Sequence, residues 1–293
     1  MSTHDGAWTI LVHGGARAIP YEDRALFADG CREAAAAGGQ LLAAGSTALD
    51  AAEAAVRVLE NLPQFNAGTG SVCNCEGDVE MDAVIMDGET LAIGGVAALR
   101  GVRHPVSVAR ALLDEVPTLL VGDGARRFAD RLGAEAALDC PASPASANSG
   151  GCDTVGCVTR DQRGHVAVAG STGGLEGKMV GRVGDTPLPG CGLYADDHQG
   201  AAALSGDGEH ISRGMLAAHA MFALQNGGPT AAAGLAIGKL SRTGGEAGVI
   251  VVDPAGGFGV AHNSECFSIA VAAHWIDGVR AGTHADELKE YYS

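Results

Sequence analysis

A threonine directly follows a connector-like segment in the middle of the chain. Residues 133–153 are small and polar, contain proline and lack periodicity, as expected of an exposed linker. Residues 154–160 (TVGCVTR) then alternate as a β-strand does. If the bond between Asp153 and Thr154 is cut, the new α-amine lies within reach of the Thr154 hydroxyl and can act as its general base. The junction predicts either a processing site with a threonine nucleophile or a linker followed by an ordinary strand threonine.

An N-terminal amine suits the role of general base. Its reference pKa is about 7.7–8.0, so a useful fraction is unprotonated near neutral pH, whereas a lysine amine would remain charged. One residue would then supply both the nucleophile and the base for acyl transfer.

Two charged residues could hold an amino acid beside such a nucleophile. Arg182 and Asp185 lie three positions apart in a glycine-rich stretch. The guanidinium can bind an α-carboxylate and the carboxylate can bind an α-ammonium group. The alternative is a surface ion pair, which would contribute little to stability.

The cysteines offer a different nucleophile. Eight are present, without a CxxC pair or a histidine at zinc-finger spacing, at positions 31, 73, 75, 140, 152, 157, 191 and 266. We expect reduced core thiols. A cysteine hydrolase is an alternative, but Cys157 lies in a strand-like stretch, where a buried inert thiol is favoured over a reactive one.

Composition limits the partners. The 293 residues are 46% hydrophobic, enough for a large core, and the formal net charge of -16 disfavours nucleic acid and anionic membrane surfaces. The opening MSTHDGAWTILVHGGA lacks a basic region before an apolar stretch, and no apolar run is long enough to span a bilayer. We therefore expect a cytoplasmic protein with a small-molecule substrate.

Periodicity predicts strands in hairpin-like pairs separated by blocks of helices. Strands are expected at 8–12, 79–87, 91–99, 119–121, 154–160, 165–171, 247–253, 257–262 and 267–273, with a tight turn at 13–15. Helices are expected at 23–44, 49–59, 105–115, 124–132, 209–225 and 230–240, with a short surface helix at 286–292. The pattern favours an α/β (α+β) protein with largely antiparallel sheets in a layered αββα arrangement.

An ordered set of motifs resembles the plant-type (type 2) L-asparaginase/isoaspartyl peptidases of the N-terminal nucleophile hydrolase superfamily. The motifs extend over nearly the full chain and are His13-Gly14-Gly15-Ala16, Phe65-Asn66-Ala67-Gly68-Thr69-Gly70, Met81-Asp82-Ala83, Met86-Asp87-Gly88, Thr154-Val155-Gly156, Ser171-Thr172-Gly173-Gly174, Gly181-Arg182-Val183-Gly184-Asp185, Gly190-Cys191-Gly192-Leu193-Tyr194-Ala195 and His262-Asn263-Ser264-Glu265.

The resemblance implies a four-layer αββα sandwich made as a precursor that cleaves itself. The α subunit would be 1–153 and the β subunit 154–293, which together form one composite domain. Family members usually assemble two of each subunit, so a homo-oligomer of precursors that becomes (αβ)2 is expected.

The resemblance also implies roles for individual residues. Thr154 takes the place of the nucleophile, and Thr172 that of the threonine that hydrogen-bonds and tunes it. Ser205 and Gly206 align with a Thr-Gly pair that forms the oxyanion hole. The serine keeps the hydroxyl donor but lacks the methyl group that restricts χ1, so rate or specificity could differ. Without the resemblance, this segment would be a turn and a helix N-cap.

Substrate and ion sites are implied in the same way. Arg182 and Asp185 match the family residues that bind the amino acid head group, and Asn66 matches an asparagine near the nucleophile. The loop 59–68 matches a segment that holds a structural sodium ion through main-chain carbonyls, with Leu59, Glu60, Phe65 and Ala67 as the ligand-bearing residues. No cofactor is expected for the chemistry.

The resulting hypothesis is a self-processing threonine hydrolase that cleaves β-aspartyl dipeptides, L-asparagine or both and releases L-aspartate. One alternative is a glycosylasparaginase that hydrolyses N4-(β-N-acetylglucosaminyl)-L-asparagine, because Asp153 precedes the nucleophile and Tyr194-Ala195-Asp196-Asp197 resembles that sister family. His13-Gly14-Gly15-Ala16 and Gly173 favour the first reading. Another alternative is an uncleaved, non-catalytic binding protein. The sequence leaves the preferred substrate and the rate of self-cleavage open.

Overall fold

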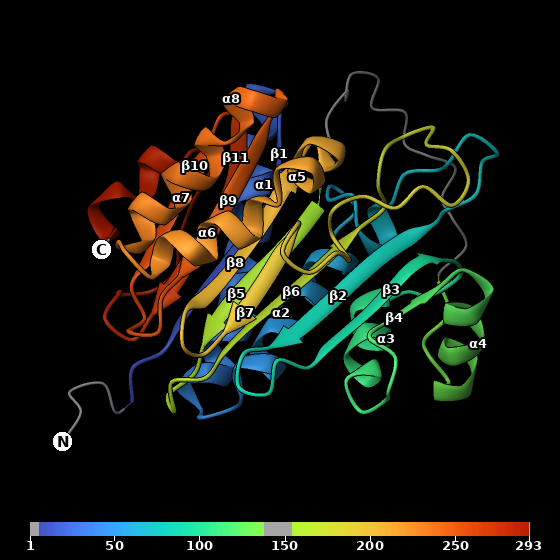
Figure 1. Ribbon diagram of the computed structural model, residues 1–293, viewed down its shortest axis with the longest axis horizontal. Helices are drawn as coiled ribbons and strands as arrows, with labels where there is room; N and C mark the ends of the chain where they lie inside the picture. The colour runs from blue at the N-terminus through green and yellow to red at the C-terminus, as the bar shows by residue number, and fades with distance from the viewer. Residues whose placement is uncertain (1–5, 138–153, 293) are drawn as a thin grey trace.

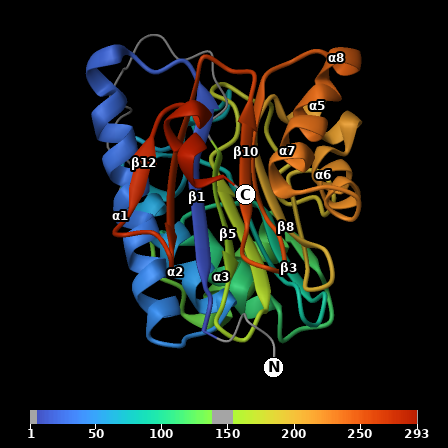
Figure 2. The same cartoon turned by 90° about the vertical axis from the view of Figure 1, so that its left-hand side faces the viewer.

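Two β-sheets lie face to face between two layers of helices (Figures 1 and 2). The computed structural model describes residues 6–137 and 154–292. Within these ranges the larger sheet has eight strands in the order β12-β11-β1-β5-β6-β2-β3-β4, and the smaller has four in the order β10-β9-β8-β7. All pairs are antiparallel except β3 with β4. The expected αββα fold class with largely antiparallel sheets is confirmed.

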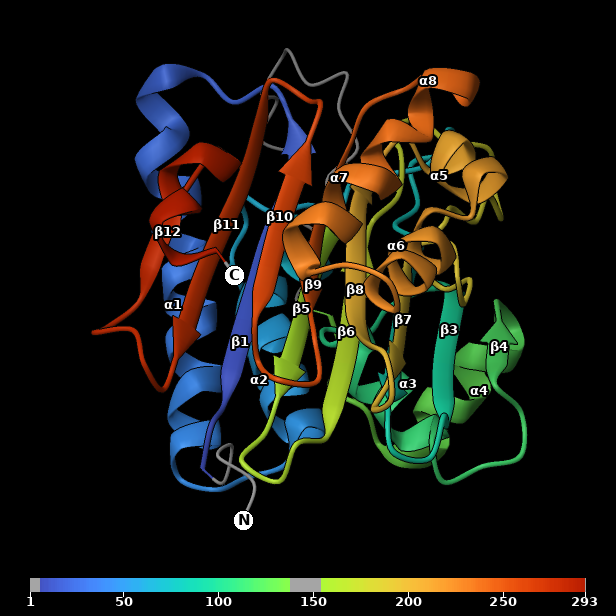
Figure 3. The same cartoon turned by 60° about the vertical axis from the view of Figure 1, so that its left-hand side comes forward.

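The strands of the larger sheet are β1 (Thr9–Arg17), β2 (Met81–Asp87), β3 (Ile93–Leu99), β4 (Leu119–Val121), β5 (Thr154–Arg160), β6 (Val166–Thr172), β11 (Cys266–Ala273) and β12 (Arg280–Gly282). Those of the smaller sheet are β7 (Leu193–Asp196), β8 (Gly200–Gly206), β9 (Ala247–Val252) and β10 (Phe258–His262). Figure 3 shows β1 and β5 near the middle of the larger sheet, behind the smaller one.

Helices cover the outer face of each sheet. The larger sheet is covered by α1 (Arg24–Ala43), α2 (Ala48–Asn61), α3 (Pro105–Leu112) and α4 (Asp123–Leu132). The helices α5 (Gly208–Gly214), α6 (Leu216–Leu224), α7 (Pro229–Gly238) and α8 (Leu240–Thr243) lie on the side of the smaller sheet (Figure 2). Short 3-10 helices span Tyr21–Asp23, Gly68–Gly70 and Ala285–Tyr291. No helix in the described ranges has the length and apolar content to cross a bilayer.

The core is continuous on both faces of the larger sheet. Leu11, Val158 and Phe258 pack between the two sheets, and Val12 and Val155 pack against the helices on the other side. Every residue of β5 is buried. A strand buried on both faces is held firmly by its neighbours, so its first residue has a well-defined position.

Most of the expected elements are confirmed. The hairpins β2-β3, β5-β6 and β9-β10 form where the alternation predicts them. The helix α2 begins after Thr47, whose hydroxyl accepts a hydrogen bond from Asp50 N at 3.0 Å, as the capping pattern indicates. The short helix near the C-terminus is a 3-10 helix.

The single helix expected at 209–225 is wrong. Met215 has a φ of +47° and separates α5 from α6. Ile211 and Leu216 are both buried, although on one straight helix they would lie about 140° apart. The bend brings both side chains into the core and leaves Met215 and Phe222, expected on the buried face with Ala218, 53% and 60% exposed.

Segments rich in glycine and alanine form parts of β1 and β8 that the sequence pattern did not predict as strand. The tight turn expected at 13–15 is instead a continuation of β1, with an irregularity between His13 and Ala16 and a φ of +112° at Gly15. Strand β8 (GAAALSG) was not expected, because its alanines and glycines lack strand propensity. The sheet accepts these small residues because the neighbouring layers pack closely on them.

Candidate active site

Thr154 is the first residue of β5, between β1 and β6. It is 6% exposed, its backbone N–H donates to Ser205 Oγ at 3.2 Å, and its Oγ1 lies 3.4 Å from Thr186 Oγ1. Asp153 and the cleavage bond fall outside the described residues. The nitrogen and the hydroxyl of Thr154 therefore both face groups that other segments supply.

Ser205 and Gly206 belong to the smaller sheet, and Ser205 contacts the candidate nucleophile Thr154. They end β8, and Ser205 Oγ accepts a second hydrogen bond from Ala16 N at 3.2 Å. Gly206 has a φ of +146°, and a Cβ there would lie 2.2 Å from Glu246 O. Glycine is required at this position because a side chain would collide with backbone. Asp207 occupies the N-cap position of α5, as the segment predicts, but its Oδ2 accepts a hydrogen bond from Glu246 N at 2.8 Å and not from the helix.

Thr172 lies directly opposite Thr154 in the β5-β6 pair, at the end of β6. Its hydroxyl accepts a hydrogen bond from Gly174 N at 2.9 Å. Asn66 holds the same turn: its Nδ2 donates to Gly174 O at 2.6 Å, and its Oδ1 accepts from Val72 N at 3.0 Å. The amide of Asn66 is therefore engaged by backbone, and the side chain supports the turn after Thr172.

Arg182 and Asp185 come together at the pocket, but Arg182 makes its ion pair elsewhere. Its Nε and Nη2 bind the two oxygens of Glu209 at 2.9 and 2.8 Å. A Cβ added at Gly184 would lie 3.0 Å from Nη1 of Arg182. The fork therefore points Nε and Nη2 toward α5 and Nη1 toward the glycine-rich loop.

Asp185 is buried, and its Oδ2 has no hydrogen-bond partner among the described residues. Burial raises the pKa of Asp185 to about 7, although the positive charge of Arg182 opposes the rise. A buried carboxylate without a partner is unfavourable. A cationic ligand at Oδ2 would compensate its charge.

These groups line one small pocket. The lining residues are Thr154, Thr172, Gly174, Arg182, Gly184, Asp185, Thr186, Gly206 and Gly208. The enclosed volume is about 10 Å³, which is room for about one water molecule. An amino acid could enter only after the pocket widens.

Two further charges lie behind the pocket. Asp82 lies opposite Thr172 in the β2-β6 pair and accepts a hydrogen bond from Ala98 N at 2.9 Å. Burial raises the pKa of Asp82, and the nearby charge of Lys178 lowers it. Lys178 Nζ donates to Glu80 O at 2.7 Å, and burial lowers the pKa of this amine. This buried pair influences the electrostatics around Arg182 and Asp185.

Three residues near the pocket were not predicted from the sequence as part of the site: Thr186, Glu209 and Lys178. Thr186 directly follows the Gly181–Asp185 motif, and this adjacency was its one available signal. Glu209 lies on α5, and no local pattern links it with Arg182. Lys178 lies in an irregular glycine-rich stretch, where burial of an amine has no sequence signature.

None of the six cysteines in the described ranges lines the pocket at Thr154. Cys157 is fully buried, and burial raises the pKa of its thiol. Cys31 and Cys266 are also buried, as expected, whereas Cys75 is exposed and Cys73 and Cys191 are partly exposed. These six are free thiols, and Cys140 and Cys152 lie outside the described residues. A buried, protonated Cys157 is a poor nucleophile.

Gly68 and Gly70 pack closely against backbone oxygens of the loop 59–68. A Cβ at Gly68 would lie 2.4 Å from Glu60 O, and one at Gly70 would lie within 2.6 Å of both Pro63 O and Phe65 O. No group of three or more His, Cys, Asp or Glu side chains among the described residues could hold a metal ion. The carbonyl oxygens present are compatible with a hard cation such as sodium.

A four-layer αββα sandwich with a threonine at the head of a central strand is the architecture of N-terminal nucleophile hydrolases. The family model described as asparaginase matches residues 6–140 and 134–277. The chain therefore belongs to this asparaginase family.

Curated relatives of about 40% sequence identity align with most of the chain. The isoaspartyl peptidase/L-asparaginase of Danio rerio is 40% identical over 90% of this chain and 91% of its own length. The Mus musculus protein of the same name is 41% identical over 86% and 84%. The isoaspartyl peptidase of Salmonella typhimurium is 38% identical over 87% and 92%.

Proposed function

We propose that this chain is a self-processing amide hydrolase that releases L-aspartate from β-aspartyl dipeptides, L-asparagine or both. The observation that carries the proposal is the position of Thr154 at the head of β5, with its nitrogen against Ser205 and its hydroxyl against Thr186. Family membership and the names of the relatives support the substrate class.

The chemistry follows from this geometry once the bond before Thr154 is cut. The freed amine accepts the proton of Oγ1 as Oγ1 attacks the side-chain carbonyl of the substrate. The Gly206 N–H would stabilise the oxyanion, and Ser205 would hold the amine by the contact that its Oγ now makes with Thr154 N. The protonated amine then gives its proton to the leaving nitrogen. Water hydrolyses the Thr154 ester, with the same amine as base, and aspartate is released.

Substrate recognition would use Arg182, which is paired with Glu209, and Asp185, whose Oδ2 has no hydrogen-bond partner among the described residues. The α-ammonium group of the substrate would bind the unpartnered Oδ2 of Asp185, and the α-carboxylate would bind Arg182. Glu209 would fix the guanidinium orientation through its two hydrogen bonds. Thr172 and Asn66 would position the turn that forms one wall of the pocket.

A structural sodium ion in the loop 59–68 is part of the proposal. We expect the main-chain carbonyls of Leu59, Glu60, Phe65 and Ala67 to hold it, and its role would be to fix the segment that carries Asn66, whose Nδ2 donates to Gly174 O. Exchange of sodium for choline at constant ionic strength should lower Tm. An unchanged Tm would remove the ion from the proposal.

The experiment that tests the proposed function is intact-mass spectrometry after incubation, with aspartate release measured on the same sample. β-Aspartyl-leucine, asparagine and N-acetylglucosaminyl-asparagine are supplied separately. We expect two fragments divided between Asp153 and Thr154, and aspartate from one or both of the first two substrates. Turnover of the third alone would instead indicate a glycosylasparaginase.

Thr154→Ala and Thr154→Ser form the matched pair of variants. The alanine variant should remain one chain and release no aspartate, whereas the serine variant should retain slow cleavage because it keeps the hydroxyl. Processing or turnover in the alanine variant would overturn the assignment. A single uncut wild-type mass without aspartate release would favour a binding protein.

A further inference from the structure

A second pocket is lined by residues of the helices that cover the smaller sheet. Figure 2 shows these helices on the outer side of that sheet. Its volume is about 260 Å³, and its lining comes from the α5-α6 junction, α6 and the α7-α8 region. The lining residues are Arg213, Gly214, His219, Lys239, Arg242 and Thr243. None of them lines the pocket at Thr154, so the two sites are separate.

The charges in this pocket are of one sign. No carboxylate is among its lining residues, and Arg213, Lys239 and Arg242 form no ion pair within residues 6–137 and 154–292. The whole chain has only 19 lysines and arginines against 35 acidic residues. Three cations that line one pocket without a carboxylate among the lining residues repel one another, and an anion would relieve the repulsion.

The types of side chain indicate which anion fits. Guanidinium groups bind the oxygens of phosphate in a bidentate manner, and an ammonium group adds a point charge. His219 is half-buried, and burial together with the charge of Lys239 lowers its pKa. This imidazole therefore lies close enough to Lys239 for the ammonium charge to disfavour its protonation.

We propose that this pocket, named the cationic pocket, binds a phosphate-type oxyanion, supplied as inorganic phosphate or as the phosphate group of a small metabolite. The inference concerns a site other than the catalytic one and does not depend on the proposed function.

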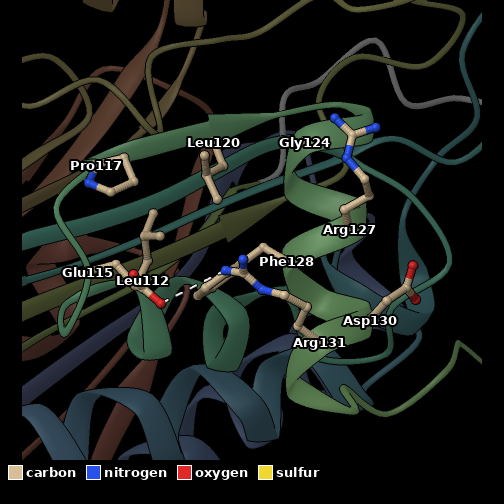
Figure 4. A pocket seen from close by; sticks show the side chains of 9 residues that line it. All are labelled: Leu112, Glu115, Pro117, Leu120, Gly124, Arg127, Phe128, Asp130 and Arg131. Atoms are coloured by element: carbon tan, nitrogen blue, oxygen red, sulfur yellow. Dashed lines mark ion pairs between the residues drawn. The ribbon is translucent and has the colours of Figure 1, made fainter.

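A third pocket also contains arginines but differs from the cationic pocket in its acidic lining residues. It lies between the end of α3 and α4, has a volume of about 550 Å³ and also contains two arginines, Arg127 and Arg131 (Figure 4). Here Glu115 and Asp130 are part of the lining, and Arg131 lies 3.9 Å from Glu115. Acidic neighbours already compensate its charge, so it should not select anions.

The test is a titration of the full chain with inorganic phosphate and, separately, with glycerol phosphate at constant ionic strength. The His219 ring is observed by NMR, and His219→Gln identifies its signal. We expect a saturable shift and a rise in the His219 pKa, because a bound anion stabilises the imidazolium. Tighter binding of the ester would indicate a metabolite, and equal or tighter binding of inorganic phosphate would indicate the free ion.

The paired variants are Arg213→Gln with Arg242→Gln, and Arg127→Gln with Arg131→Gln. The first pair should weaken phosphate binding by about tenfold for each guanidinium removed, whereas the second should bind like wild type. If the first pair does not fold, Lys239→Gln alone should still weaken binding. The absence of a saturable shift, or equal affinity in wild type and the first pair, would overturn the proposal.

Discussion

At the scale of the residue, burial shifts the pKa of titratable groups near Thr154, such as Asp185 and Lys178. Asp185 is the clearest case, because its carboxyl is buried and its Oδ2 has no hydrogen-bond partner in the described part of the chain. Its pKa of about 7 lies within the range in which the proposed enzyme would work.

We predict that KM rises as pH falls through about 7. Only the ionised Asp185 can bind the substrate ammonium, so a pKa of about 7 implies a KM about tenfold higher at a pH near 6 than at a pH near 8. Steady-state kinetics on a β-aspartyl dipeptide would measure this. Asp185→Asn should have a high KM that no longer depends on pH in this range. A KM of wild type that is flat with pH would contradict the role.

The same group makes a separate prediction for stability. The folded state binds this proton more tightly than the unfolded state, whose carboxyl keeps a pKa near 3.8. Its contribution to stability is therefore present at low pH and is lost as pH rises toward about 7. Asp185→Asn should have a higher Tm than wild type at pH above 7 and show a smaller difference at acidic pH. A constant difference would exclude this titration.

Thr186 should act on the nucleophile without binding substrate. Its hydroxyl is 3.4 Å from that of Thr154, and loss of one such contact should lower kcat by about three- to tenfold with KM unchanged. Thr186→Val removes the hydroxyl at similar volume, and Thr186→Ser keeps it. Kinetics of both variants provide the test. Equal kcat values would show that the hydroxyl does not assist Thr154.

At the scale of the element, close packing of β5 on its neighbours holds Thr154. Gly156 pairs with His13 in β1 and with Gly170 in β6. The His13 ring is fully buried, and a Cβ added at Gly156 would lie 2.2 Å from its Nε2. Burial lowers the pKa of His13 to about 3, although the backbone of Thr154 opposes the shift, so the ring is neutral.

Gly156→Ala should therefore disturb β5. Because the His13 ring is fully buried, we expect a loss of about 1–3 kcal/mol in stability, seen as a lower Tm, together with slower self-cleavage. Gly234→Ala is the control, because Gly234 is exposed on α7 with nothing within 4 Å of an added Cβ. It should raise stability by about 0.5–1 kcal/mol. Similar Tm values for the two variants would contradict this account.

At the scale of the whole molecule, segments from before and after Thr154 alternate within one sheet. The order β12-β11-β1-β5-β6-β2-β3-β4 places β1 from the first part between β11 and β5 from the second. Backbone hydrogen bonds thus cross between the two parts on both sides of β1 and again between β6 and β2. Separation of the parts would require disruption of the sheet.

After cleavage the two fragments should remain together. Size-exclusion chromatography with light scattering should show one species that resolves into two chains only in denaturant. The same measurement tests the (αβ)2 assembly that the family resemblance implies. Exposed apolar side chains favour it, namely Met215 at the α5-α6 junction, Phe222 on α6 and Leu235 on α7. Fragments that separate on a native column would contradict the interleaved sheet, and a mass of one chain would contradict the assembly.

The sequence by itself determined most of the local elements and the identity of the threonine candidate. Hydrophobic alternation identified β5 and β6, and the linker composition indicated the junction before Thr154, because both signals lie within a few neighbouring residues. The ordered motifs also indicated Arg182, Asp185, Ser205 and Gly206.

Only the tertiary structure decided what these residues contact. In the fold, Arg182 binds Glu209, and the hydroxyl of Thr186 lies beside that of Thr154. The amide of Asn66 binds backbone. The cationic pocket is lined by residues from three separate segments. The tertiary structure also bent the chain at Met215, because burial of both Ile211 and Leu216 outweighed continuation of one helix. Such contacts join residues that are distant in the chain, and their free energies depend on burial and packing that no local pattern records.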